Sequence, residues 1–220
     1  MDWLTLTHQS SEFHHPFNHY GRMVLDTEED SEHKRFPWKL RGYEGWHVGR
    51  ASHGIRDGGS ILQLSGQAAA DRLDTATYLA DNVSRVDIAV TVRLDPPDPD
   101  LEREHWGQYL AWLQSEGSAM KGKLECSSDG SATMYVGRRT SPRYFRIYNK
   151  ELEDRDAQGG DYDGRYDGCH RYELEVKGDQ ARPLAEEVSM APLPGYHITC
   201  LVAGYCRQHG IDHSPFPTLP

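Results

Sequence analysis

The sequence predicts an α+β fold, in which a central antiparallel sheet carries helices packed on one face. Three segments, 84–92, 144–150 and 171–177, alternate apolar and polar residues with the two-residue period of a strand. Other segments carry apolar residues at the spacing of one helix face. Strands and helices that are each apolar on one side bury those sides against one another. The 220 residues are enough for one domain with a substantial core.

The strands follow from alternation and from turn residues. In segment 144–150, Phe145 and Ile147 are expected to face the core, while Arg146, Tyr148 and Lys150 share the opposite face. A turn at 140–142, ending in proline, suggests that this strand forms a hairpin with its predecessor. The expected strands, in chain order, are 60–65, 84–92, 133–137, 144–150 and 171–177.

Four helices are expected, at 67–80, 101–115, 181–188 and 196–209. The second shows the pattern most clearly, because its apolar residues repeat at i, i+3, i+4 and i+7. That stripe is predicted to lie in the core and consists of Trp106, Tyr109, Leu110 and Leu113.

Acidic residues gather in three segments that are expected to be solvated surface loops. These are the clusters within 26–32, 95–100 and 151–167, the second of which holds three prolines and the third a Gly-Gly pair. The main domain is expected to span 1–190, followed by a C-terminal helix and Pro-rich tail over 191–220.

The formal net charge of −10 argues against a protein that coats nucleic acid in bulk, because the total charge repels phosphate. The window 121–150 is the exception, since seven Lys or Arg against two Asp or Glu give it a charge of +5. No apolar run is long enough to cross a membrane, and the N-terminus lacks a signal-peptide pattern. The four cysteines have no metal-binding spacing, which favours reduced thiols and a cytoplasmic protein.

Carboxylates on the polar faces of two strands suggest a metal site. Glu173 and Glu175 are two residues apart on one strand, and Asp87 could join them if the 84–92 strand is a neighbour. Clustered carboxylates are costly without a cation, and oxygen ligands alone favour Mg²⁺ or Mn²⁺. The alternative is a ladder of Arg–Glu salt bridges across the strands.

Tyr148 is a candidate nucleophile. A free tyrosine is ionised in only about one molecule in a thousand at neutral pH, so catalysis requires phenolate stabilisation or a base. Arg146 and Lys150 flank it on the same predicted face and are expected to lower its pKa. The surrounding basic surface favours a phosphate-containing substrate, while the alternative is a tyrosine with only a structural role.

Three stretches carry a resemblance to a known family. They are 83–89 (VSRVDIA), 135–150 (YVGRRTSPRYFRIYNK) and 171–175 (RYELE), supported by 2–7 and 62–67. Together they resemble the Rep_trans family, the rolling-circle replication initiation factors of plasmids and filamentous phages, with related relaxases of conjugative elements.

The resemblance implies a strand-specific DNA nickase with rejoining activity, whose tyrosine forms a covalent 5′-phosphotyrosine intermediate. Motif matching assigns the nucleophile to Tyr148, and residues 1–190 become the catalytic domain. The implied metal is Mg²⁺ or Mn²⁺, and the implied DNA is a single-stranded or hairpin-extruded origin. A host helicase and a second copy of the chain are further candidate partners. The metal ligands would be Asp87, Glu173 and Glu175, the catalytic cations Arg146 and Lys150, and the DNA-binding residues Lys121, Lys123, Arg138, Arg139 and Arg143.

Two departures from the family pattern leave alternatives open. Family members often have a second acid four residues after the aspartate equivalent to Asp87, where this chain has Thr91. The family's proteins also commonly run longer. The alternatives are a relaxase with the same chemistry, a metal nuclease that activates water, and a non-catalytic protein that binds origin DNA. His14, His15 and His19 are not expected to bind metal.

Overall fold

The computed structural model describes nine stretches of the chain and divides it into two compact units. The first unit comprises Met1–Ile88 and Val176–Pro194, and the second comprises Ala89–Glu175 and Gly195–Pro220. Two long strands, β6 (Asn82–Arg93) and β10 (Cys169–Lys177), contribute residues to both. The described residues are 3–8, 26–29, 38–41, 47–55, 59–71, 73–93, 99–117, 122–126 and 132–211.

In the first unit the strands follow the order β2-β3-β4-β5-β1-β6, with antiparallel neighbours. Alternate residues of β1 and β5, such as Leu4 and Leu64, are completely buried and form the core of this unit. The strand bounds are β1 Trp3–His8, β2 Asp26–Glu29, β3 Trp38–Arg41, β4 His47–Ile55 and β5 Gly59–Ser65.

The helices of the first unit are α2 (Gly66–Asp71), α3 (Leu73–Leu79) and α6 (Ala181–Met190), the last preceded by the 3₁₀ turn η6 (Gly178–Gln180). The guanidinium of Arg182 on α6 donates to the carbonyls of Thr77 and Ala80 at 3.2 and 2.7 Å. It therefore satisfies carbonyls left without helical partners at the end of α3.

In the second unit the order is β6-β10-β9-β8-β7, with β7 at Lys123–Cys126, β8 at Ala132–Val136 and β9 at Arg143–Asn149. Strands β8 and β9 form the expected hairpin. Its turn begins at Gly137, whose φ of +88° suits a residue without a Cβ.

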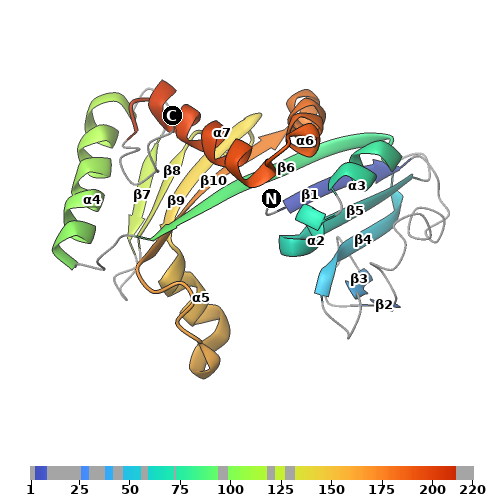
Figure 1. The fold of residues 1–220 in the computed structure, drawn as a ribbon, viewed down its shortest axis with the longest axis horizontal. Helices are drawn as coiled ribbons and strands as arrows, with labels where there is room; N and C mark the ends of the chain where they lie inside the picture. The colour runs from blue at the N-terminus through green and yellow to red at the C-terminus, as the bar shows by residue number, and fades with distance from the viewer. Residues whose placement is uncertain are drawn as a thin grey trace. The chain divides into compact units, whose positions relative to one another are not determined.

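Helices of the second unit pack on the apolar side of its strands. They are α4 (Pro99–Trp112), which continues as the π-helical turn η4 (Leu113–Gly117), and α7 (Pro194–Gln208). Tyr205 of α7 packs on Phe145 with ring centroids 4.9 Å apart, and Tyr109 of α4 shares a 2.7 Å hydrogen bond with Tyr172. The helix α5 (Lys150–Gln158), followed by the 3₁₀ turn η5 (Gly159–Asp161), instead extends from the end of β9 away from α7 (Figure 1).

The predicted α+β fold is confirmed, including the five expected strands, and all four expected helical regions contain helices. Of the predicted stripe only Tyr109 is fully buried, since Trp106 and Leu113 are half-buried and Leu110 is 44% exposed, while Trp112 is buried instead. The indole of Trp112 donates to the carbonyl of His209 at 2.9 Å, which anchors it beside the end of α7.

The prediction that the three acidic segments are loops is wrong for part of each segment. Residues 26–29 form β2, and α4 begins at Pro99, where a proline fits the first helical turn because its missing N–H has no partner there. Residues 150–158 form α5, in which acidic residues of the first turn face the positive end of the helix dipole.

Other sequence predictions have mixed outcomes. The four cysteines, all among the described residues, form no disulfide, as expected. Within the described part of the chain, no helix is long and apolar enough to cross a membrane. The expected domain boundary near residue 190 stays a prediction. The histidines at 14, 15 and 19 lie outside the described residues.

Candidate active site

Tyr148 and Glu173 meet on the polar side of β9 and β10, opposite the side that the helices cover. The phenol of Tyr148 donates to Oε2 of Glu173 at 3.5 Å, a long hydrogen bond. The guanidinium of Arg146 forms an ion pair with Oε1 of the same glutamate. It also lies 5.5 Å from the centre of the Tyr148 ring. One carboxylate therefore orients both candidate catalytic side chains of β9.

Burial, rather than the neighbouring cations, dominates the acidity of Tyr148. Its removal from water raises the phenol pKa well above its ordinary value, and the negative charge of Glu173 raises it further. Arg171 and Arg146 act in the opposite direction but with smaller effect. Arg146 therefore lowers this pKa as predicted, but burial and Glu173 outweigh it, so the expected net lowering of the Tyr148 pKa is wrong. The phenol is therefore protonated at neutral pH, and a role as a nucleophile would need a proton acceptor.

Glu173 and Glu175 are buried, although the alternation of β10 predicts that they face outward. Only 1% of Glu173 and 5% of Glu175 is exposed, while Tyr172 and Leu174 are buried on the other side of the strand. Both faces of β10 are therefore covered. A carboxylate in such a position requires compensating donors or cations, and Arg146 and Tyr148 supply them to Glu173.

A cleft of about 290 Å³ opens beside Tyr148. One side consists of strand residues, because Thr133 pairs with Tyr148 and Tyr135 pairs with Arg146 in the register of β8 and β9. The other side is α5, which begins immediately after β9. Among the residues that line the cleft are Thr133, Tyr135, Arg146, Tyr148, Glu153 and Asp156.

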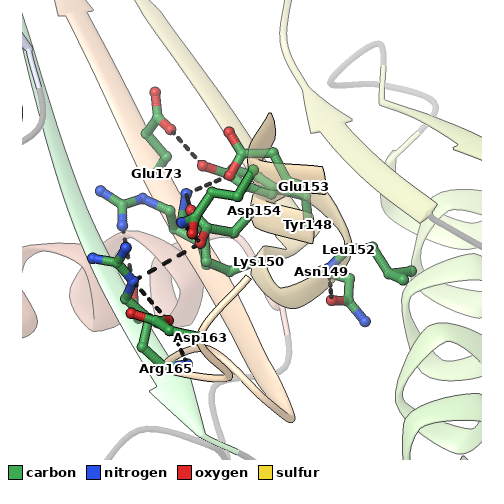
Figure 2. Close-up of polar contacts among 12 residues, drawn as sticks. Tyr148, Asn149, Lys150, Leu152, Glu153, Asp154, Asp163, Arg165 and Glu173 are labelled. Atoms are coloured by element: carbon green, nitrogen blue, oxygen red, sulfur yellow. Dashed lines mark hydrogen bonds and ion pairs between the residues drawn. The ribbon is translucent and has the colours of Figure 1, made fainter. Parts of the chain in front are cut away.

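Lys150 belongs to a network of charges at the start of α5 (Figure 2). The sequence predicted Lys150 as the last residue of the strand, but it is the first residue of that helix. Its ammonium forms an ion pair with Glu153 and lies 3.7 Å from Oδ1 of Asp154. Arg165 approaches the same Asp154 at 4.0 Å. Lys150 is thus held by acids of its own helix.

Thr91 and Arg171 interact across β6 and β10. The guanidinium of Arg171 donates to Oγ1 of Thr91 at 3.1 Å, and its charge is one of those that lower the pKa of Tyr148. The hydroxyl of Thr91 therefore binds a cation that also acts on Tyr148.

The predicted DNA-binding residues lie mainly at the β8–β9 turn. Arg138, Arg139 and Arg143 are all exposed there. Lys123 is on β7, where it pairs with Glu125 and lies 4.8 Å from the centre of the Tyr135 ring. Lys121 lies outside the described residues.

Comparison with known proteins gives the family and the fold. The Rep_trans family, described as replication initiation factors, matches residues 81–210, which include Tyr148, Glu173 and the basic turn. The chain belongs to this family. A solved structure of a rolling-circle replication initiator protein from Geobacillus stearothermophilus is similar, with a TM-score of 0.62 and 16% identity. The match covers 100% of this chain and 91% of that chain, and shows that the fold is shared. No curated protein gives a significant match.

The acids of this replication initiation factor match a hard divalent cation in donor type. The glutamates 173 and 175 offer carboxylate oxygens, which suit Mg²⁺ or Mn²⁺ and do not suit soft metals. Asp87 belongs to the first unit, where Arg85 binds both of its carboxylate oxygens. The Arg146–Glu173 pair is one salt bridge across strands of the kind that the alternative predicts, whereas Arg85 and Asp87 pair within a single strand. No group of three or more His, Cys, Asp or Glu arranged to hold a metal is found among the residues that the structure describes.

Sequence reasoning missed the α5 side of the cleft in this replication initiation factor. Glu153 and Asp156 fell within a segment that was expected to be a loop, although their i, i+3 spacing places them on one helix face. Tyr135 was missed as well, but its position two residues from Thr133 on a predicted strand was a usable signal.

Proposed function

We propose that this replication initiation factor cuts and rejoins one strand of origin DNA by transesterification at Tyr148. The observation that carries the proposal is that the buried Glu173 pairs with both Tyr148 and Arg146, which line one cleft. The family membership supports the role in replication initiation, and the exposed arginines of the β8–β9 turn support DNA as the partner.

The chemistry exchanges one phosphodiester for another. The oxygen of Tyr148 attacks the phosphorus, the bond from phosphorus to the 3′ oxygen breaks, and the strand leaves with a 3′ hydroxyl. The 5′ phosphate remains as a tyrosyl ester, so the reverse attack by a 3′ hydroxyl rejoins the strand without a nucleotide cofactor. The phenol proton has an acceptor at hand in Oε2 of Glu173. Arg146 is placed to stabilise negative charge that develops on the phosphate oxygens.

A divalent cation completes the proposal. Glu173 and Glu175 would hold it, and Mg²⁺ or Mn²⁺ when bound would polarise the phosphate under attack. The assignment of Asp87 as a third ligand stays a prediction from the sequence. Lys150, which lies against Glu153 and Asp154, is proposed as a further cation for phosphate. A host helicase and a second copy of the chain stay predictions.

The first test is a covalent-adduct assay. We expect the full chain, incubated with labelled single-stranded oligonucleotides from the DNA around its own gene and with Mn²⁺, to form a protein–DNA adduct that survives denaturation. Mass spectrometry should locate the phosphate on Tyr148. Tyr148→Phe should lose the adduct completely, because no nucleophilic oxygen remains.

The matched control for this assay is Tyr162→Phe, which also removes one phenol from the second unit. Tyr162 donates to Asp167 and does not line the cleft, so its variant should form the adduct at the wild-type level. An adduct that persists in Tyr148→Phe would contradict the assignment. Cleavage without an adduct, surviving in Tyr148→Phe but lost in Glu173→Gln, would instead show a metal nuclease that activates water.

A further inference from the structure

The α5 side of the cleft beside Tyr148 does not suit phosphate. The two side chains that α5 contributes, Glu153 and Asp156, are both exposed acids, and Arg146 is the only cation among the six lining residues named above. A phosphate placed against α5 would meet the like charges of Asp156 and of Glu153, the second of which is already paired with Lys150. The phosphates of a bound strand are better placed along the exposed arginines of the β8–β9 turn. The cleft itself suits a neutral group rich in hydrogen-bond donors.

The strand side of the cleft offers an aromatic surface in a fixed position. Tyr135 stacks on Tyr144, with ring centroids 5.8 Å apart and an angle of 19° between the planes. The ammonium of Lys123 lies on the ring from the neighbouring strand, 4.8 Å from its centroid. Tyr135 is half-buried and lines the cleft with the part of its side chain that these two neighbours leave uncovered. Aromatic side chains held in this way are the usual partners of unstacked bases.

The chemistry of the acids narrows the choice of base. Carboxylates accept hydrogen bonds and donate none, so they favour cytosine, adenine and guanine, which carry exocyclic amino groups. Thymine has no amino group, and its one free ring N–H lies between two carbonyl oxygens, which the acids repel. The volume of about 290 Å³ is close to that of the smallest ligand sites and admits one base while its phosphate stays outside.

We propose that this cleft binds one nucleobase of single-stranded DNA and selects a base with an exocyclic amino group. Glu153 and Asp156 accept from the amino group, and the exposed part of the Tyr135 side chain contacts the base. The placement of this base next to the phosphate under attack rests on the proposed function of Tyr148. The cleft would then be a specificity site that contributes to the choice of the cut position.

The test measures binding without cleavage. The full chain is titrated with fluorescein-labelled (dC)₁₂, (dA)₁₂ and (dT)₁₂ in EDTA, and binding is followed by fluorescence anisotropy. Wild-type protein should bind (dC)₁₂ and (dA)₁₂ about fivefold or more tightly than (dT)₁₂. Asp156→Asn should reduce this ratio to about twofold or less, because the amide offers donors as well as an acceptor. Affinity for (dT)₁₂ should not fall, since the substitution removes a negative charge.

Two further variants keep the test specific. Asp161→Asn makes the same change at another exposed acid of the second unit that does not line the cleft, and it should leave the ratio unchanged. Tyr135→Leu should weaken binding to all three oligonucleotides by about fivefold or more, with thermal unfolding recorded to show that the protein is folded.

The outcomes separate the base site from the nicking chemistry. Equal affinities for the three oligonucleotides, a ratio that Asp156→Asn does not alter, or no binding to any of them would overturn the base site. A base preference that depends on Asp156, combined with a failed adduct assay, would retain the base site and remove the proposed role of Tyr148. An adduct on Tyr148 without a base preference would retain the proposed role of Tyr148 and remove the base site.

Discussion

Glu173 is a carboxylate with almost no exposed surface, and two neighbours on β9 make its burial tolerable. Arg146 forms an ion pair with one of its oxygens, and Tyr148 donates to the other. A carboxylate buried in this way is favourable only while its partners are present, since removal of one partner leaves the other with an uncompensated desolvation cost. The residue therefore ties the stability of the second unit to the geometry of the candidate active site.

The substitution Glu173→Gln tests this dependence. It keeps the shape of the side chain but removes the charge that Arg146 faces, and we expect the free energy of unfolding to fall by about 1–3 kcal/mol. Urea unfolding followed by circular dichroism measures the change. Glu125→Gln breaks the exposed Lys123–Glu125 pair with the same chemistry and should leave the unfolding midpoint where it is. Equal midpoints for Glu173→Gln and the wild type would show that the buried pair contributes no stability.

For single residues, the sequence predicted correctly which face of a strand a side chain lies on, wherever apolar and polar residues alternate. Arg146, Tyr148 and Glu173 were expected on the polar faces of two strands, and the structure brings the three together. The alternation does not predict how deeply a side chain on the polar face is buried, however. Glu173 is buried because Arg146 and Tyr148 come from a different strand to cover it. The sign of the Tyr148 pKa shift was wrong for the same reason, since it depends on desolvation that no local sequence reveals.

At the scale of elements, the junction of β9 and α5 determines where Tyr148 and Lys150 lie. Asn149 is the residue between them, and its side chain accepts a hydrogen bond from the backbone N–H of Leu152 at 3.0 Å. This N-cap starts the helix one residue after Asn149, so the chain changes from strand to helix directly behind the candidate nucleophile (Figure 2). The cap also sets the direction in which Glu153 and Asp156 face the cleft.

Loss of the cap should destabilise this junction. Asn149→Ala is expected to lower the free energy of unfolding by about 1 kcal/mol, because the N–H of Leu152 loses its acceptor. Asn149→Asp retains an acceptor of the same length and should recover most of the loss. Chemical denaturation of the three proteins under one set of conditions measures both effects. An Asp variant as unstable as the Ala variant would indicate that packing of the amide, rather than capping, is important at this position.

The helix α5 shows why element prediction failed where it did. Its sequence is dominated by charges and has no apolar stripe, so periodicity gave no helix signal in residues 150–158. It is supported instead by its cap, by the i, i+4 pair of Glu151 with Arg155, and by the i, i+3 pair of Lys150 with Glu153. Strands β6, β8, β9 and β10 were predictable because each alternates or carries β-branched and aromatic residues beside a clear turn.

At the scale of the whole molecule, the distribution of charge is more informative than its total. The chain carries a net charge of −10, yet the window 121–150 carries +5. In that window Arg138, Arg139 and Arg143 are exposed at or beside one turn. Each cation that neutralises a DNA phosphate releases counterions, so affinity falls with salt in proportion to the number of such contacts. A small basic surface on an acidic protein should therefore bind single-stranded DNA with a shallow salt dependence.

The triple variant with Arg138, Arg139 and Arg143 changed to Ala tests this distribution. For single strands each phosphate contact contributes about 0.7 to the slope of log affinity against log salt, so three lost contacts should flatten the slope by about 2. Affinity should fall for every base composition alike, because phosphate contacts carry no sequence information. Anisotropy titrations in a series of KCl concentrations measure both quantities. Arg207→Ala, an exposed arginine on α7, is the control and should keep the wild-type slope. If the triple variant keeps that slope too, the DNA follows another surface, and the local positive charge of the β8–β9 turn does not determine its path.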